Sequence, residues 1–157
     1  MLIFPGIQYY EFNDLSDRPV HFVDFSQYVK SELTPKVKQQ SVHVFDKCDR
    51  KTTNEGWAMV LDASMVTLLN VDIDTLVWLG NVLMSYYPRG FKYVAIVDTP
   101  VLIYALAIFI VNLLNEEIRS RVIFITRERL PTYLDQRFIP EGLKYNNDTY
   151  APINLFG

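Results

Sequence analysis

The sequence has few of the residues that support metal-dependent or nucleophilic chemistry. Its single cysteine, Cys48, excludes an intrachain disulfide and a thiolate cluster for zinc, and it favours a reducing intracellular setting. The two histidines, His21 and His43, form no zinc-ligand spacing, and the separation of His43 from Cys48 points their side chains to different faces of a helix. No Gly-x-Gly-x-x-Gly or P-loop pattern is present. The sequence therefore predicts no metal site, no catalytic residue and no enzymatic activity.

Clustered positive charge is missing as well. The chain has 15 Lys and Arg against 18 Asp and Glu, a net charge of −3, and its longest charged run is the short stretch 47–51. Nucleic-acid binding requires clustered positive charge, so we predict no nucleic-acid partner. The start of the chain lacks a positively charged segment and its apolar run stops at Pro5, which is not typical of a signal peptide. We expect a cytoplasmic protein whose membrane contact, if any, is peripheral.

Hydrophobic residues, in contrast, are abundant. They make up 50% of the 157 residues, and aromatic residues make up 14%. A chain of this size and composition can bury one sizeable core, and its aromatic side chains can either fill that core or line an apolar cavity. We expect a single domain over 1–157, with an N-terminal extension at 1–17, a core at 18–148 and a tail at 149–157.

Short hydrophobic runs predict the strands. The runs at 57–61, 93–97 and 122–125 are nearly continuously apolar, which is typical of strands buried on both faces. The run at 20–25 has strand composition but mixed polarity, and it predicts an edge strand. We expect ordered structure to begin at Arg18.

Helical signals alternate with these strands. Thr34 as N-cap and Pro35 at the first helical position predict a helix over about 35–49, and Asn70 is the predicted N-cap of an amphipathic helix that Pro88 ends. Alternating strands and helices are typical of right-handed β-α-β crossovers. The sequence therefore predicts an α/β fold with a mostly parallel β-sheet and crossover helices.

The stretch 100–114 is the least ordinary part of the chain, because it contains no charged residue. A helix that covers a sheet normally has a polar outer face, and about 15 residues are too few to cross a bilayer, which needs about 20. Three interpretations remain open: burial within this domain, burial by a partner chain, or intermittent burial by a lipid ligand and a membrane surface.

Several of these segments together resemble the CRAL-TRIO lipid-binding family. They are the strand 57–62, the Tyr86-Tyr87-Pro88 motif, the strand and turn 93–100, the apolar helix, and the Ile139-Pro140-Glu141-Gly142-Leu143 segment. The resemblance covers about 18–148. It implies a sheet floor and a mobile gate helix that enclose one lipid. Only about 17 residues precede the first expected strand, so the N-terminal helical subdomain usual in the family is expected to be missing.

The resemblance also implies the site residues. The gate helix falls at about 101–114. The expected gate residues are Val101, Leu102, Ala105, Ile108, Phe109 and Val111. The expected pocket residues are Trp57, Met59, Met84, Tyr87, Val94 and Ile96.

Two arginines are candidates for contact with a lipid headgroup. Arg121 matches a basic position of the family, whereas Arg89 replaces the Glu that follows Tyr-Tyr-Pro in phosphatidylinositol-transferring members. Guanidinium groups bind phosphate, but both side chains could equally be solvated charges at helix ends. The closing Gly-Gly of the family is replaced by Asn147 and Asp148, which still favour a turn.

Two functions follow as hypotheses. In the first, the domain binds a phospholipid or another hydrophobic ligand, which is its only expected bound molecule, and transfers or presents it during transient contact with membranes. In the second, the fold has lost its ligand and uses the apolar helix to dock a protein partner or a second copy. Asp62 and Asp98, at predicted strand ends, are interpreted as turn caps and not as an acid–base pair.

Overall fold

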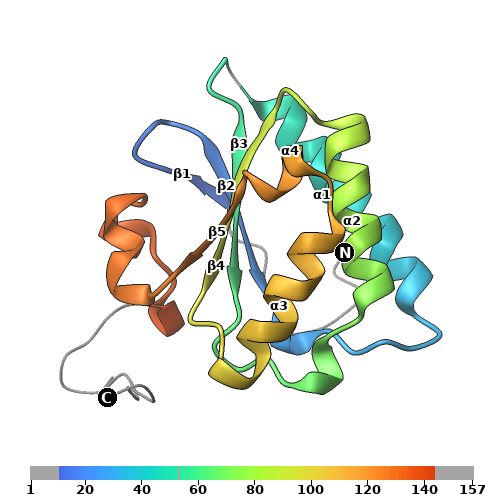
Figure 1. The fold of residues 1–157 in the computed structure, drawn as a ribbon. Helices are drawn as coiled ribbons and strands as arrows, with labels where there is room; N and C mark the ends of the chain where they lie inside the picture. Colours follow the sequence, from blue (N-terminus) through green and yellow to red (C-terminus); the bar gives the residue numbers. More distant parts are fainter. Residues whose placement is uncertain (1–10, 53, 144–157) are drawn as a thin grey trace.

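The computed structural model describes residues 11–52 and 54–143, which form a five-stranded sheet with helices packed on one face (Figure 1). The strands lie in the order β1-β2-β3-β4-β5, and β1 alone is antiparallel to its neighbour. Their bounds are Glu11–Asn13 (β1), Pro19–Asp24 (β2), Trp57–Asp62 (β3), Phe91–Val97 (β4) and Val122–Ile125 (β5). The predicted mostly parallel α/β architecture is confirmed.

The helices occupy the crossovers between parallel strands. Their bounds are Thr34–Lys51 (α1), Ile73–Tyr86 (α2), Val101–Leu113 (α3) and Glu116–Arg119 (α4). Because the strands follow one another in sheet order and every crossover has the same hand, α1 to α4 all cover the same face (Figure 1). The opposite face is covered by three short 3-10 turns, Arg127–Thr132, Gln136–Phe138 and Glu141–Leu143.

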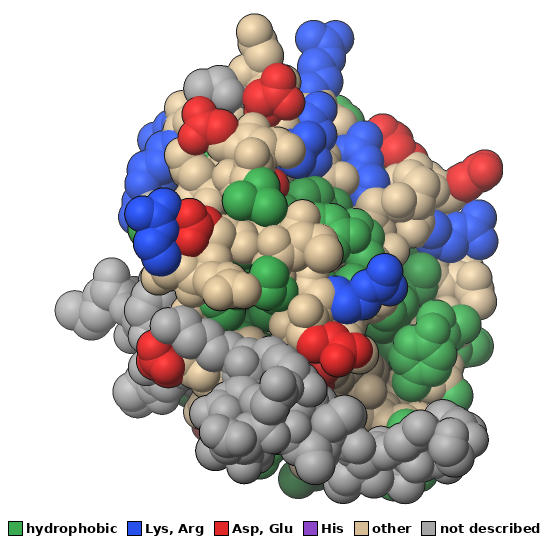
Figure 2. Space-filling model, turned by 90° about the vertical axis from the view of Figure 1, so that its left-hand side faces the viewer, with side chains coloured by type: hydrophobic (Ala, Val, Ile, Leu, Met, Phe, Trp, Pro, Cys, Tyr) green, Lys and Arg blue, Asp and Glu red, His purple; other side chains and the backbone are tan. Residues whose placement is uncertain are grey.

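Side chains of each strand alternate between these two layers, which gives the molecule two cores. In β3, Ala58 and Val60 point toward the 3-10 turns and pack with Leu130 and Leu134. Trp57 and Met59 point the other way, toward the helices. The nearly continuous apolar strands are therefore explained by burial on both faces. On the face with the 3-10 turns, Lys and Arg side chains are scattered and not gathered in one patch (Figure 2).

The helix starts follow local capping chemistry. Pro35 occupies the first turn of α1, as predicted, but the N-cap is Leu33 and Thr34 is already helical, so the prediction of Thr34 as N-cap is wrong. The N-cap of α2 is Asp72, whose carboxylate accepts a hydrogen bond from the backbone N–H of Thr75; the prediction of Asn70 is wrong. Asn70 is buried one turn earlier, where its amide donates to the carbonyls of Ser26 and Tyr28 at 3.0 and 2.6 Å.

The N-terminal end of the sheet also differs from the prediction. β2 is not an edge strand, because β1 pairs with it on its outer side, with Phe12 opposite Val20. Ordered structure therefore begins before Arg18. β1 has only three residues, too few for a hydrophobic period to be visible in the sequence. The positions Asn147 and Asp148, where a turn is expected, lie outside the described residues.

Candidate functional site

The main cavity of the molecule lies between the helix face of the sheet and helix α3. Its volume is about 170 Å³. The floor is made of Met59 and Leu61 from β3, with Val94 and Ile96 from β4, and α2 contributes Leu79, Gly80 and Leu83 to the wall. A Cβ on Gly80 would lie 2.8 Å from Leu114 Cδ2, so this glycine allows α2 to approach the segment after α3 closely.

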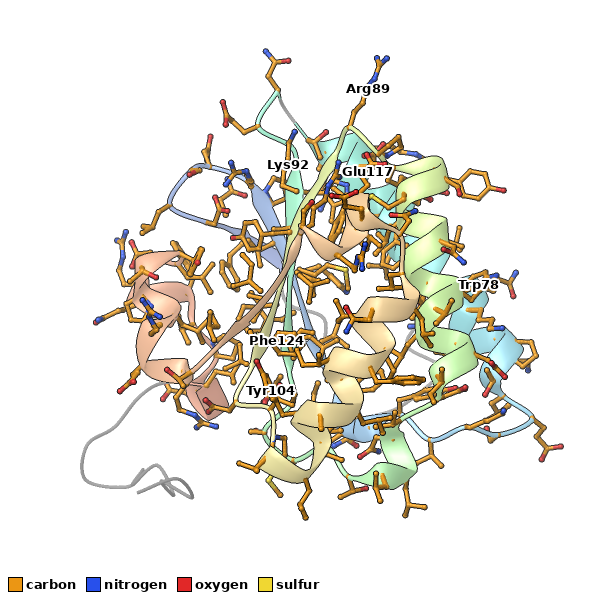
Figure 3. All side chains as sticks on the ribbon, viewed as in Figure 1. Trp78, Arg89, Lys92, Tyr104, Glu117 and Phe124 are labelled. Atoms are coloured by element: carbon orange, nitrogen blue, oxygen red, sulfur yellow. The ribbon has the colours of Figure 1, made fainter. Side chains whose placement is uncertain are left out.

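Helix α3 closes the cavity with one face and exposes the other. Its cavity-facing residues are Ile103, Ala107, Ile110 and Val111. Its exposed apolar residues include Leu102, 89% exposed, and Phe109, 53% exposed. Tyr104 packs edge-on against Phe124 of β5, with ring centroids 5.2 Å apart (Figure 3). Within the described parts of the chain, no α3 side chain makes a hydrogen bond or ion pair. Apolar contacts alone therefore hold the side chains of this helix in place.

A second, smaller cavity of about 80 Å³ adjoins the first, between α1, α2 and the sheet. The two share six wall residues, which are Phe25, Phe45, Met59, Leu61, Leu76 and Leu79. A residue that lines both cavities has atoms facing each of them, and its side chain can change rotamer. The two cavities can therefore join when a ligand displaces these side chains.

Two hydroxyls that line the second cavity share one acceptor, the Asp72 carboxylate. Tyr28 Oη and Thr75 Oγ1 each donate to Asp72 Oδ2 at 2.6 Å. Burial raises the pKa of Tyr28, and its hydrogen bond to Asp72 raises it further. Burial by itself would raise the pKa of Asp72, but the hydrogen bonds from Thr75 and Tyr28 outweigh it and lower that pKa. The carboxylate is therefore charged at neutral pH and serves as a structural cap.

Three of the six predicted pocket residues, Met59, Val94 and Ile96, line the main cavity. Trp57, Met84 and Tyr87 do not. They pack in a neighbouring cluster toward the amino end of β3, where aromatic rings fill the space; Trp57 and Phe91, for example, are 5.2 Å apart between centroids. The prediction left out three wall residues of the cavity, Leu76, Gly80 and Leu83. The hydrophobic stripe of α2 is the sequence signal that could have found them.

The predicted gate residues lie mainly on the outer face of α3. Of the six, only Val111 lines the cavity, and Ile108 is half-buried. The exposed members are Val101, Leu102, Ala105 and Phe109. The helix has no charge, and Tyr104 and Asn112 are too few polar positions for the sequence to distinguish its two faces. This is why the inward residues could not be separated from the outward ones.

The two headgroup candidates lie at the same end of the sheet, near the amino ends of β4 and β5. Arg89 is exposed and projects into solvent (Figure 3). The Arg121 guanidinium donates to the carbonyl of Phe91 and to Glu117 Oε1, the latter at 3.1 Å. Arg121 therefore ties β4 to the start of β5, and its donors are partly used by the protein itself.

The remaining candidates have structural partners. Asp62 accepts from the backbone N–H and hydroxyl of Ser64, as expected for a turn cap. Asp98 differs from the prediction, because its carboxylate pairs with Arg127, 29 residues further along. His43 is exposed and Cys48 is buried on α1. Among the described residues there is no group of His, Cys, Asp or Glu that could hold a metal ion.

The comparisons with known proteins agree with this geometry. The CRAL/TRIO domain profile matches residues 4–144. The chain belongs to the CRAL/TRIO domain family. This is a family of lipid-binding and lipid-transfer proteins. No curated protein sequence gives a significant match.

A solved structure shows the same fold as this CRAL/TRIO domain. The crystal structure of Sfh5 is similar with a TM-score of 0.58 and 19% sequence identity. The match covers 71% of this chain and 43% of the Sfh5 chain, so the domain spans less than half of that protein's length. None of the helices in the described part of the chain combines the length and hydrophobicity that a membrane span needs.

Proposed function

We propose that this CRAL/TRIO domain binds one hydrophobic ligand in the cavity under α3, and that α3 is the gate through which the ligand enters at a membrane surface. The observation that carries this proposal is the pairing of an apolar cavity with a charge-free helix that covers it. Met59, Val94 and Ile96 form the floor, and Ile103, Ala107 and Ile110 form the lid.

The size of the cavity supports a moving gate. A cavity of about 150 Å³ is known to hold a molecule such as benzene, and pockets for drug-sized ligands are roughly 300–1,000 Å³. At about 170 Å³, the cavity cannot enclose a two-chain phospholipid. To enclose a ligand of that size, α3 has to move outward or the second cavity has to join the first.

The side-chain contacts of α3 oppose such movement only weakly. Since its side chains make only apolar contacts with the rest of the described chain, no hydrogen bond or ion pair of theirs has to break when it leaves the sheet. A bilayer can replace apolar contacts at little cost, and it can also cover the exposed Leu102 and Phe109. The segment after β3, which packs against Ile103 of α3 through Val66, adds three more exposed apolar side chains, Met65, Leu68 and Leu69.

The test is native mass spectrometry of the purified chain, followed by organic extraction of what remains bound. We expect one hydrophobic molecule per chain. Ala107→Phe should lower this occupancy strongly, because a phenyl ring attached there would fill a cavity of about benzene size. Ala105→Phe is the matched control, because Ala105 lies on the exposed face of the same helix and its substitution should leave occupancy unchanged.

The exposed face of α3 also favours a second candidate, a protein-interaction module. Apolar side chains without charges are typical of the centre of a protein interface, and Tyr104, Phe109 and Leu113 fit that description. A ligand-free dimer in the same mass spectra would support this second function and contradict the first. A ligand-bound monomer would do the opposite.

A further inference from the structure

Strand β5 forms the edge of the sheet opposite to β1. In Figure 1 it lies in front of β4, with α3 on one side and the 3-10 turns on the other. All four of its residues, 122–125, are half-buried, although the strand pairs with β4 along its whole length. An edge strand presents a row of unpaired backbone N–H and C=O groups, to which another strand can bind.

The backbone of β5 bonds to β4 with every second residue. The carbonyl of Arg121, directly before the strand, accepts from the N–H of Val94 in β4 at 2.9 Å. Because the backbone groups of successive strand residues point to opposite sides, the N–H and C=O groups of Val122 and Phe124 point away from the sheet. Within the described part of the chain, no residue forms a hydrogen bond with these outward groups.

β5 lacks the features that usually prevent pairing at a sheet edge. Natural edges are protected by charged residues, by proline or by a β-bulge. The sequence of β5, Val-Ile-Phe-Ile, contains no charged residue and no proline, and its register with β4 is regular. The sequence of β1 at the opposite edge, Glu-Phe-Asn, contains two polar residues out of three. Of the two edges, β5 is therefore the one that favours addition of another strand.

A second copy of the same strand fits this edge. In an antiparallel pair, two residues that lie directly opposite each other exchange both of their backbone hydrogen bonds or neither. Placing Val122 of one chain opposite Phe124 of the other uses every outward group of both strands, and Ile123 then lies opposite its own copy. A register shifted toward Thr126 is less suitable, because the Thr126 carbonyl already accepts from the N–H of Arg129 at 3.0 Å.

The side chains of β5 support the same pairing. Phe124 lies on the helix face of the sheet, in contact with Tyr104 of α3, whereas Ile123 packs on the face with the 3-10 turns (Figure 3). Pairing places Val122 beside Phe124 on the first face and brings the two Ile123 side chains together on the second. Aromatic and β-branched neighbours of this kind stabilise a sheet. Because β5 contains no charged residue, no like charges face each other within the paired strands.

We propose that two copies of this chain associate by antiparallel pairing of their β5 strands, which makes one continuous sheet with a two-fold axis at Ile123. This inference goes beyond the proposed function, because it concerns neither the ligand nor the gate, and it uses the sheet edge and not the exposed face of α3. The contact is the same on both copies and closes on itself, so it gives a dimer and not a fibre. Four residues a side form a short interface, and we expect a dissociation constant between about 1 μM and about 1 mM.

The test is disulfide trapping of the whole chain, with oxidised glutathione as the oxidant. The two Ile123 Cα atoms should lie about 4.5 Å apart, within the range of a disulfide, so Ile123→Cys should give a covalent dimer. Ile125→Cys is the matched control, because Ile125 is half-buried on the same face of the same strand. Its two copies should lie about 13 Å apart, too far for a disulfide. The wild type should not link either, because Cys48 is buried.

Amide hydrogen exchange of the wild type gives a readout that needs no substitution. The N–H groups of Val122 and Phe124 should exchange quickly at about 10 μM protein and become protected at about 1 mM, as mass action requires. The N–H of Ile123, which points toward β4, should be protected at both concentrations. Protection of Val122 and Phe124 at both concentrations would show that the edge is covered within one chain and would overturn the proposal. Equal trapping of Ile123→Cys and Ile125→Cys, or a dimer that Ile123→Cys does not trap, would overturn it too.

Discussion

At the scale of single residues, Tyr93 links the first hairpin to the centre of the sheet. Its hydroxyl donates to Asp14 Oδ2 at 2.8 Å, and the Arg18 guanidinium lies over its ring. Asp14 is itself buried and also accepts from the backbone N–H groups of Ser16 and Arg18. Burial, followed by the hydrogen bond to Asp14, raises the pKa of Tyr93 above its ordinary value of 10.0.

This raised pKa predicts a loss of stability in alkali. Below about pH 10 the phenol is neutral in both the folded and the unfolded chain. Above that pH the unfolded chain loses the proton while the folded chain keeps it, so the free energy of unfolding falls as pH rises. Tyr93→Phe should lower stability by about 1 kcal/mol at neutral pH, through the lost hydrogen bond, and should make the alkaline decline shallower. Urea unfolding between about pH 8 and about pH 11 measures both effects.

A decline equally steep in the wild type and in Tyr93→Phe would contradict this account. Tyr28 and Tyr87 also have raised pKa values, in both cases from burial first and then from a hydrogen bond to an aspartate, so part of the decline should remain in the variant.

Asp98 shows which property of a single residue could not be predicted from the sequence, namely a partner that is distant along the chain. Asp62 and Asp98 both follow a buried strand, and both were expected to cap a turn. Asp62 does so through Ser64, whose position two residues later is visible in the sequence. The partner of Asp98 is Arg127, which β5 brings beside it from a distant part of the chain. Long-range partners of this kind have no local signal.

At the scale of elements, prediction succeeded where the hydrophobic pattern was long. The strands β3, β4 and β5 and the helices α1 and α2 have strong patterns, and the structure places each close to its predicted range. β1 was missed because it is short, and β2 was predicted close to its observed range but wrongly as an edge strand, because the strand on its outer side was unseen. Of the six residues predicted for the floor and wall of a pocket, Met59, Val94 and Ile96 line the main cavity and the other three do not.

The outer face of α3 supports a prediction about membrane contact. Phe109→Asp places a charge on an exposed apolar position of this helix and should abolish binding to phospholipid vesicles, because a charge resists burial in the apolar region of a bilayer. The free energy of unfolding should fall by no more than about 1 kcal/mol, since the Phe109 side chain is already 53% exposed. Vesicle co-sedimentation and urea unfolding measure the two quantities.

The control for this variant is Asn112→Asp, which adds the same charge at an exposed polar position of the same helix. It should reduce vesicle binding less than Phe109→Asp does. If both variants bind vesicles like the wild type, then α3 does not contact the membrane.

At the scale of the whole molecule, the two faces of the sheet differ: the face under the 3-10 turns supplies stability, and the face under the helices contains the cavities. The core between the sheet and the 3-10 turns, with Leu130 and Leu134 fully buried, is closed and supplies stability. The helix side contains both cavities and α3, whose side chains make only apolar contacts within the described part of the chain. Elements that move in binding are generally drawn from the less stable part of a fold. The proposed gate therefore lies on the side where local opening disturbs the rest of the domain least.

The charge distribution of the whole molecule predicts how vesicle binding depends on salt. The net charge is −3, and of the two headgroup candidates Arg121 is partly occupied by Glu117 and Phe91. Docking through apolar side chains alone should be as strong on neutral phosphatidylcholine vesicles as on anionic ones, and it should change less than about twofold between roughly 0.05 M and 0.5 M NaCl. Co-sedimentation over this range measures it. Binding that requires anionic lipid and falls steeply with salt would show instead that basic side chains carry the docking, and Arg89→Ala would then identify whether the exposed arginine is one of them.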